Sequence, residues 1–286
     1  MENPPETTLV KLEIDEASCH ISLSREEKYN AMNSQMIEEL IGLLNWSAEN
    51  SVATQGRLHD DGGTPLLRVI VISGAGKHFC AGADINMMRD AGVKTPEENR
   101  TDSERLDRLF NTLWAHPCFT ISTVQGVALG GGAGLLACSD HVIALDSARI
   151  ALSEAKLGIL PAVIGPYVYR RVGSAQFRRL AMLAGRFDGR EALNIGMIDQ
   201  VSTSSEESAE MVDAAIATVM STGPVAVTEA KGLVQTFDRW HGTDEDLRRW
   251  TLDKTSEMRG SPEGQEGLSA FLDRRPPAWS PEDQDG

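Results

Sequence analysis

The sequence lacks any long apolar run. No stretch of about 18 consecutive apolar residues occurs, which argues against a membrane-spanning helix. Its first residues, MENPPETTLVKLEID, are acidic and have neither the basic start and apolar centre of a secretory signal nor the arginine-rich composition of a transit peptide. We therefore expect a cytoplasmic protein without a membrane partner.

Positive charge is scarce as well. The chain has 27 Lys and Arg against 42 Asp and Glu, a formal net charge of −15. Binding of nucleic acid phosphates needs a basic surface, so nucleic acid is not expected as a partner. A small anionic ligand is still compatible with this composition, because a few local cations suffice to bind it.

The four cysteines, Cys19, Cys80, Cys118 and Cys138, are few and widely spaced, and no CxxC pair is present. This spacing is typical neither of a metal site nor of a disulfide framework. We expect buried free thiols and no bound metal.

What the sequence does contain is the pattern of an α/β protein. Its 286 residues suffice for one large domain or for a core with a smaller part. Residues 9–25 predict a β-hairpin and 33–50 a helix capped by Asn33 or Ser34, and the polar, glycine-rich segment 51–67 predicts a mobile or partly disordered loop. Strands and helices then alternate up to about residue 173, with a helix over 99–117 ended by Pro117, and helices dominate afterwards. The order favours an α/β core followed by a helical segment.

Three segments combine small residues with a passage from strand to helix: HFCAGADINMM (78–88), VQGVALGGGAGLLACSD (124–140) and ARIALSEAKLGILPAVIGP (148–166). Glycines at a helix start expose backbone N–H groups and suit an anion or a developing oxyanion. The alternative is that they only permit a tight turn and close packing. One N–H from Ala83 and one from Gly131 would make two donors for a single carbonyl oxygen.

Together these segments, with SEAKLGILP among them, resemble the enoyl-CoA hydratase/isomerase family, the crotonase superfamily, and the likeness runs from about Leu9 to Trp279. The resemblance implies the crotonase fold, a spiral of β-β-α repeats with a helical C-terminal region. We expect the spiral core over 1–200 and a helical trimerisation region over 201–286. It also implies acyl-CoA thioester substrates, a homotrimer or dimer of trimers, and no cofactor, since CoA is part of the substrate.

The resemblance assigns roles to particular residues. The oxyanion hole falls on Ala83 and Gly131. The CoA pocket falls on EEKYNAMN, with Lys28, Asn30 and Ala31 near the adenine and phosphates. Ala81 and Asp84 are expected to line the same groove.

The catalytic carboxylates depart from the family pattern. Hydratases of this family commonly carry two glutamates, but the first position is Gly134 here and only the second is kept, as Glu154. A single glutamate in an apolar pocket has a raised pKa and can move a proton. That suffices for a double-bond isomerase, and for hydration if both new atoms come from one water. Alternatively, the substrate supplies a carboxylate of its own.

The segment SEAKLGILPAVIGPYVYRRVG resembles the bacterial branch that acts on 3-methylglutaconyl-CoA and isohexenylglutaconyl-CoA in leucine and acyclic-terpene breakdown. The second carboxylate of such substrates should meet a cation, for which Arg89, Arg170 and Arg171 are candidates. Tyr167 and Gly134 are placed at the acyl pocket, although Tyr167 could also simply pack.

The predicted function is therefore a hydratase, or a dehydratase in reverse, of a branched glutaconyl-type enoyl-CoA. One alternative is a Δ3-Δ2 enoyl-CoA isomerase that uses Glu154 alone. The other is a non-catalytic protein of the same fold that binds acyl-CoA, against which the retention of Glu154 and both donor segments counts.

Overall fold

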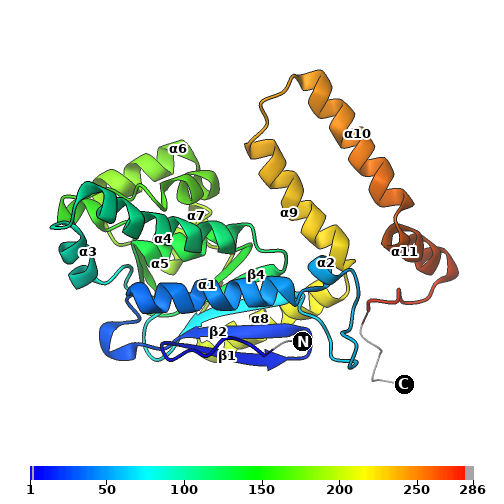
Figure 1. The fold of residues 1–286 in the computed structure, drawn as a ribbon, viewed down its shortest axis with the longest axis horizontal. Helices are drawn as coiled ribbons and strands as arrows, with labels where there is room; N and C mark the ends of the chain where they lie inside the picture. The colour runs from blue at the N-terminus through cyan, green and yellow to red at the C-terminus, as the bar shows by residue number, and fades with distance from the viewer. Residues whose placement is uncertain (2, 281–286) are drawn as a thin grey trace.

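The computed structural model describes residues 1 and 3–280 (Figure 1). Its main sheet has six strands in the order β1-β2-β3-β4-β6-β8, in which β1 is antiparallel to β2 and all other neighbours are parallel. These strands are β1 (Val10–Asp15), β2 (Ser18–Leu23), β3 (Val69–Gly74), β4 (Phe119–Val124), β6 (His141–Leu145) and β8 (Gln200–Ser202). A second, parallel sheet consists of β5 (Val127–Leu129) and β7 (Arg149–Ala151).

Eleven helices are described in residues 1 and 3–280: α1 (Ser34–Glu49), α2 (Val52–Gln55), α3 (Ile85–Ala91), α4 (Pro96–Trp114), α5 (Gly131–Cys138), α6 (Gly165–Leu183), α7 (Gly189–Asn194), α8 (Ser205–Met220), α9 (Pro224–Asp238), α10 (Asp244–Gly260) and α11 (Pro262–Asp273). Short 3-10 turns lie at Glu26–Lys28 and Glu154–Leu157. The successions β4-β5-α5 and β6-β7-α6 are two strand–strand–helix units, which confirms the predicted repeat.

The N-terminal hairpin and the first helix agree with the sequence patterns. Ile21 and Leu23 of β2 are fully buried, as alternation in a half-buried strand predicts. Helix α1 begins after Asn33, whose side chain accepts a hydrogen bond from the N–H of Met36 at 2.9 Å. The expected cap at Asn33 is thereby confirmed over the alternative at Ser34.

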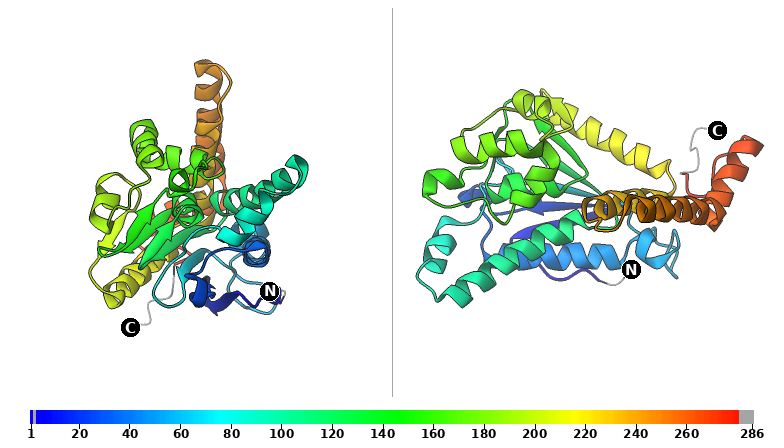
Figure 2. Two further views of the ribbon diagram at one scale, coloured as in Figure 1. Left: turned by 90° about the vertical axis from the view of Figure 1, so that its left-hand side faces the viewer. Right: turned by 90° about the horizontal axis from the view of Figure 1, so that it is seen from above.

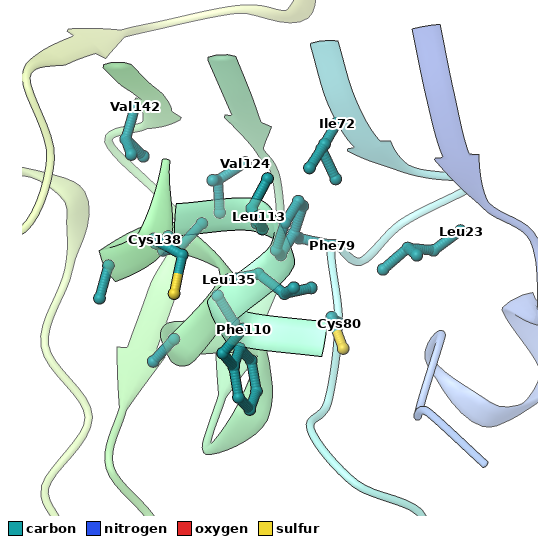
Figure 3. Packing of buried hydrophobic residues seen from close by; sticks show 14 of the residues in the cluster. Leu23, Ile72, Phe79, Cys80, Phe110, Leu113, Val124, Leu135, Cys138 and Val142 are labelled. Carbon is teal, nitrogen blue, oxygen red and sulfur yellow. The ribbon is translucent and has the colours of Figure 1, made fainter. Parts of the chain in front are cut away.

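The main apolar core lies between the main sheet and the helices α1, α4 and α5. Figure 3 shows Ile72, Val124 and Val142 on the strands facing Phe110 and Leu135 on the helices. The core is continuous from the hairpin to α6, so the elements that carry the candidate site share one rigid support.

The prediction of a mobile loop over 51–67 is wrong in part. Ser51 caps the short helix α2, and its backbone pairs with Leu67 in a parallel bridge. A second bridge joins His59 to Pro65. The polar, glycine-rich composition hid these backbone pairs because they involve residues far apart in the segment.

Helix α4 starts earlier than predicted. Thr95 forms a reciprocal capping box with Glu98, Pro96 is the first helical residue, and the helix ends at Trp114, three residues before Pro117. Proline therefore lies at both ends of this helix: Pro96 is its first residue, and Pro117 follows its last turn.

The predicted boundary at residue 200 needs correction. Strand β8 completes the main sheet, and α8 packs Val212 and Val219 against Val69, Val71 and Ile121 of that sheet. Core packing therefore continues to the end of α8. The helices that project from the core are α9, α10 and α11, which we call the C-terminal arm (Figures 1 and 2).

The C-terminal arm is anchored by polar contacts rather than by an apolar core of its own. Within its helices only Pro224 and Ala270 are buried. Lys231 of α9 donates to the carbonyl oxygens of His116 and Cys118 at 2.7 and 2.8 Å and pairs with Asp140 at 2.6 Å. The predicted trimerisation role of the arm stays a prediction.

All four thiols are free and buried, which confirms their prediction. Burial raises the pKa of Cys19 and of Cys80 to about 12, so both are poor nucleophiles. In the described part of the chain no single helix is long and apolar enough to cross a membrane; α8 and α9 meet that test only as a pair, bent by 102°.

Candidate active site

Three chain segments are brought side by side where short parallel strands end. Cys80 lies opposite Ala128 of β5 in a parallel bridge: its N–H donates to Val127 O and its carbonyl oxygen accepts from Leu129 N–H, both at 3.0 Å. Leu129 in turn pairs with Ala151 of β7. The chains that follow, 81–84, 130–131 and 152–154, therefore leave the same edge together. Sequence alone could not show this meeting.

Two glycines shape that edge. Gly82 has φ +94° and a Cβ there would lie 2.6 Å from the Leu129 carbonyl oxygen; Gly130, which precedes α5, has φ +50°. Both the positive φ and the close backbone approach favour glycine. The turns they permit bring the N–H of Ala83 and that of Gly131 to the same place.

The two predicted oxyanion donors are neighbours. A Cβ built on Gly131 would lie 3.6 Å from the backbone nitrogen of Ala83. Neither N–H donates to any residue in the described part of the chain, and both residues keep part of their surface exposed. Two free N–H groups side by side are the arrangement that stabilises a thioester oxygen on which negative charge develops. Their role in this chain stays a prediction.

Glu154 is placed beside these donors. It opens the 3-10 turn after β7, and its Oε1 would lie 3.0 Å from a Cβ on Gly130. Its Oε2 is buried and has no hydrogen-bond partner among the described residues. Burial raises the pKa of this carboxyl above its ordinary value. A buried, unpartnered carboxylate oxygen is available to accept a proton or to hold a water.

The position of the missing glutamate is filled by apolar side chains. A Cβ on Gly134 would clash with Ile164 Cγ2 and lie 2.9 Å from Phe110 Cε1. Gly134 is one helical turn after Gly131, so this apolar wall faces the same part of the site. The position at which the family pattern has its second glutamate is therefore closed by apolar side chains.

The predicted CoA segment lies along the donor segment. The N–H of Ala81 donates to Tyr29 O at 3.0 Å, that of Met32 to Gly82 O at 2.8 Å, and Met32 O accepts from Asp84 at 2.8 Å. The structure therefore brings Lys28, Asn30 and Ala31 next to Ala81 and Asp84. Lys28 is exposed, and Ala31 and Ala81 are partly exposed, so these residues remain accessible to a ligand.

For Asn30 and Asp84 the structure shows a supporting role of the side chains, and their predicted place at the ligand stays a prediction. The fully buried amide of Asn30 donates to Ala75 O and His78 O at 3.0 and 2.7 Å. The carboxylate of Asp84 caps α3 and pairs with Arg25 at 2.7 Å, and this ion pair holds its pKa below the usual range. Both side chains fix the groove from behind, because their polar atoms are already bonded within the protein.

Tyr167 packs, as one of the two interpretations expected. Its buried ring contacts Phe110 and Trp114 at centroid distances of 6.3 and 5.9 Å. Two candidate cations are engaged elsewhere. Arg170 pairs with Asp238 at 2.8 Å, and Arg171 pairs with Asp199 at 2.6 Å. Arg89 remains as a candidate, because among the described residues its one ion-pair partner is its neighbour Asp90, at the surface of α3.

Sequence reasoning missed four contributors to this site: Arg25, Met32, Phe110 and Ile164. Met32 Cε would lie 2.8 Å from a Cβ on Gly131, so its side chain borders the donor pair. No local pattern marks these residues, since each contributes through contacts far away along the chain. The one available signal was Gly134 itself, whose missing side chain implied that other groups fill the space.

Comparisons with known proteins show the family and the fold. A family described as Enoyl-CoA hydratase/isomerase matches residues 13–282. A crystal structure of an enoyl-CoA hydratase from Shewanella pealeana is 32% identical, with a TM-score of 0.86 over 96% of this chain and 97% of that one. Pseudomonas aeruginosa AtuE is 34% identical, with a TM-score of 0.85 over 96% of this chain and 100% of that one. An enoyl-CoA isomerase/hydratase of Zymoseptoria tritici is 27% identical over 91% of this chain and 82% of its own length.

A mixed α/β fold with these strand ends and this glutamate therefore defines an enzyme of the crotonase type. The chain belongs to the enoyl-CoA hydratase/isomerase family, whose substrates are acyl-CoA thioesters.

Proposed function

We propose that this protein hydrates a branched glutaconyl-type enoyl-CoA, or dehydrates the corresponding hydroxyacyl-CoA in reverse, with Glu154 as its single acid–base group. The observation that carries the proposal is the buried, unpartnered Oε2 of Glu154 next to the free N–H groups of Ala83 and Gly131.

The proposed reaction follows from that arrangement. The thioester oxygen accepts hydrogen bonds from Ala83 and Gly131, which stabilises the enolate formed when water adds to C3. Glu154 takes one proton from the attacking water and delivers it to C2, so the water supplies both the hydroxyl and the hydrogen. The chemistry needs neither a metal nor a redox cofactor, and CoA enters only as part of the substrate.

The glutaconyl acyl group is supported by Arg89. Its side chain is 72% exposed and lies on α3, which starts two residues after the donor Ala83. Ile85 and Arg89 share one face of that helix, since they are four residues apart. An apolar and a cationic side chain on one face suit a branched acyl chain that ends in a carboxylate.

A second candidate is the Δ3-Δ2 enoyl-CoA isomerase. The apolar wall at Gly134 favours it, because an isomerase needs one base to move one proton and no second group to hold a water. In this reaction Glu154 removes the proton from C2 and returns it to C4.

The test follows the conjugated-enoyl absorbance of 3-methylglutaconyl-CoA and of crotonyl-CoA with wild type, Glu154→Gln and Arg89→Gln. We expect wild type to consume the glutaconyl ester and Glu154→Gln to lose at least about a hundredfold in rate. Arg89→Gln should raise KM for the glutaconyl ester alone. Arg100→Gln on exposed α4 is the matched surface control. If wild type leaves both esters unchanged but converts a 3-enoyl-CoA, the isomerase is the function.

The oligomer belongs to the same proposal. Among the described residues, six large apolar side chains of the C-terminal arm are 48–82% exposed: Val234, Phe237, Leu252, Leu268, Phe271 and Leu272. Such exposure supports burial against further copies of the chain. A mass of three or six chains by light scattering is expected, and a monomer at working concentration would contradict it.

A further inference from the structure

Trp114, the last residue of α4, is held from the C-terminal arm and from α6 at once. The guanidinium carbon of Arg239, at the end of α9, lies 5.0 Å from the centre of its ring, and that of Arg170 on α6 lies 5.1 Å from it. Asp238, the chain neighbour of Arg239, also pairs with Arg170 at 2.8 Å. Cation–π contacts of this kind contribute about 0.5–2 kcal/mol each.

The position of α9 against this tryptophan is well defined. Gln235 donates to the Trp114 carbonyl oxygen at 3.3 Å, and Thr228 donates to Pro117 O at 2.9 Å. With the three bonds of Lys231, these contacts fix α9 along residues 114–118. A shift of α9 therefore moves Arg239 relative to the Trp114 ring.

On its inner side, Trp114 supports the wall of the candidate site. Its ring meets that of Tyr167 edge to face, with the planes at 65°. Tyr167 in turn packs on Phe110, and Phe110 closes the space beside Gly134 together with Ile164. A continuous series of contacts thus leads from Arg239 on the arm through Trp114 and Tyr167 to the apolar wall beside Gly134.

We propose that Trp114, clamped by Arg170 and Arg239, is a positioning residue that holds the Phe110–Tyr167 wall of the acyl pocket in place. The inference rests on the proposed function for what the pocket does, although the clamp itself is a feature of packing. Trp114 touches no reacting atom in this account. It acts through Phe110, by keeping the space beside Gly134 closed to water.

The clamp has a consequence for Glu154 that a purely structural role would not produce. Burial is the main cause of its raised pKa, opposed only by its own backbone N–H, and no charged neighbour contributes. If the wall loosens, water enters and the pKa of Glu154 falls toward its ordinary value. The acid limb of the pH–rate profile then moves to lower pH.

The experiment compares Arg239→Ala with wild type by kcat, KM and pH–rate profile on the enoyl-CoA that wild type converts. We expect kcat to fall about three- to tenfold with little change in KM, and the acid limb to move down. Arg239→Lys retains a cation over the ring and should restore most of the loss. Arg249→Ala is the matched control, because Arg249 lies on the same arm, is 67% exposed and, among the described residues, pairs with Glu245 and Asp246 of its own helix alone.

A second measurement keeps the inference separate from the proposed function and from loss of folding. Hydrogen exchange should rise in residues 110–114 and 164–168 of Arg239→Ala but not of Arg249→Ala, whatever the substrate is. If both variants match wild type in exchange and in kinetics, the clamp does not position the wall. If wild type converts no enoyl-CoA while exchange rises as expected, the proposed function fails and the clamp stands.

Discussion

Ile164 occupies the space into which a side chain on Gly134 would project: its Cγ2 clashes with the position of a Cβ there. The family's second carboxylate is thus excluded by a specific neighbour as well as being absent from the sequence. The two positions have to change together before a glutamate can be accommodated.

Replacing Gly134 alone with glutamate should therefore destabilise the protein. Overpacking a filled core costs about 1–3 kcal/mol, and a buried carboxylate adds to that cost. The double variant Gly134→Glu with Ile164→Ala should regain part of the loss, because the clashing methyl group is removed. Urea unfolding measures the free energy of unfolding of the single and of the double variant. Gly185→Glu is the control, since a Cβ there meets nothing within 4 Å.

The same double variant distinguishes the two candidate reactions. If the pocket is built for water, a glutamate at 134 should increase hydration of crotonyl-CoA. If 3-enoyl-CoA isomerisation remains the faster reaction in both proteins, the hydratase interpretation loses its support.

Gly131→Ala should reduce catalysis with little effect on folding. The new Cβ would lie 2.8 Å from Met32 Cε, a flexible end that can move, and 3.6 Å from the N–H donor of Ala83. It would narrow the space for the thioester oxygen, so we expect kcat to fall about 10²-fold. The substitution Gly232→Ala in α9 is the matched control, because its nearest neighbour atom is 4.0 Å away. If Gly131→Ala and Gly232→Ala have equal kcat, Gly131 does not contribute to the oxyanion hole.

The raised pKa of Glu154 predicts a pH dependence of activity. As a base the carboxyl must be ionised, so kcat/KM should fall as the pH drops through its raised pKa. The midpoint should lie above the roughly 4.3 of an ordinary glutamate. A midpoint at or below that value would mean that the carboxyl is solvated, contrary to the buried Oε2.

The same shift predicts a stability difference of opposite sense to that of most carboxylates. The folded protein holds the Glu154 proton more tightly than the unfolded chain does. Stability is therefore lost as the pH rises from the unfolded pKa through the folded one. Glu154→Gln should unfold at higher urea than wild type above that range, and the difference should vanish below about pH 4. An equal difference at all pH values would indicate packing rather than charge.

Arg68 should matter for stability although it lies outside the site. Its buried guanidinium donates to the carbonyl oxygens of Val219, Met220, Thr222 and Trp279. Arg68, directly before β3, thus joins the end of α8, the turn into α9 and the segment after α11. Arg68→Ala leaves these acceptors without their donor, at a cost of roughly 2–4 kcal/mol. Arg100→Ala on exposed α4 should change the free energy of unfolding by less than about 0.5 kcal/mol. If Arg68→Ala and Arg100→Ala change the free energy of unfolding by similar amounts, water replaces the Arg68 contacts.

Sequence reasoning succeeded where the signal was local. The hairpin, the cap at Asn33 and the glycine turns at residues 82 and 130 follow from alternation, side-chain chemistry and backbone freedom. It was less successful where the cause was distant: the order in 51–67 depends on pairing between Ser51 and Leu67, and the place of α8 depends on contact with β3 and β4.

The candidate site shows the same division. Motifs predicted Ala83, Gly131 and Glu154, and the structure places the three close together, because each motif contains the turn that positions its own residue. Their catalytic roles stay predictions. The supporting roles of Asn30 and Asp84 were missed. A motif shows that a residue belongs to a site without showing whether its polar atoms face the ligand or the protein behind it.

The parallel pairing of Cys80 with Ala128 and of Leu129 with Ala151 has a consequence for how such a site can diverge. Main-chain hydrogen bonds set where the two donors and the Glu154 carboxyl emerge, whereas side chains such as Ile164 and Phe110 decide what fits between them. The placement of the reactive groups and the shape of the space between them therefore depend on different residues. Substitutions of the surrounding side chains can change substrate preference in small steps, while the main-chain hydrogen bonds keep the two donors and the carboxyl in place. Related proteins can therefore come to accept new thioesters without losing this arrangement.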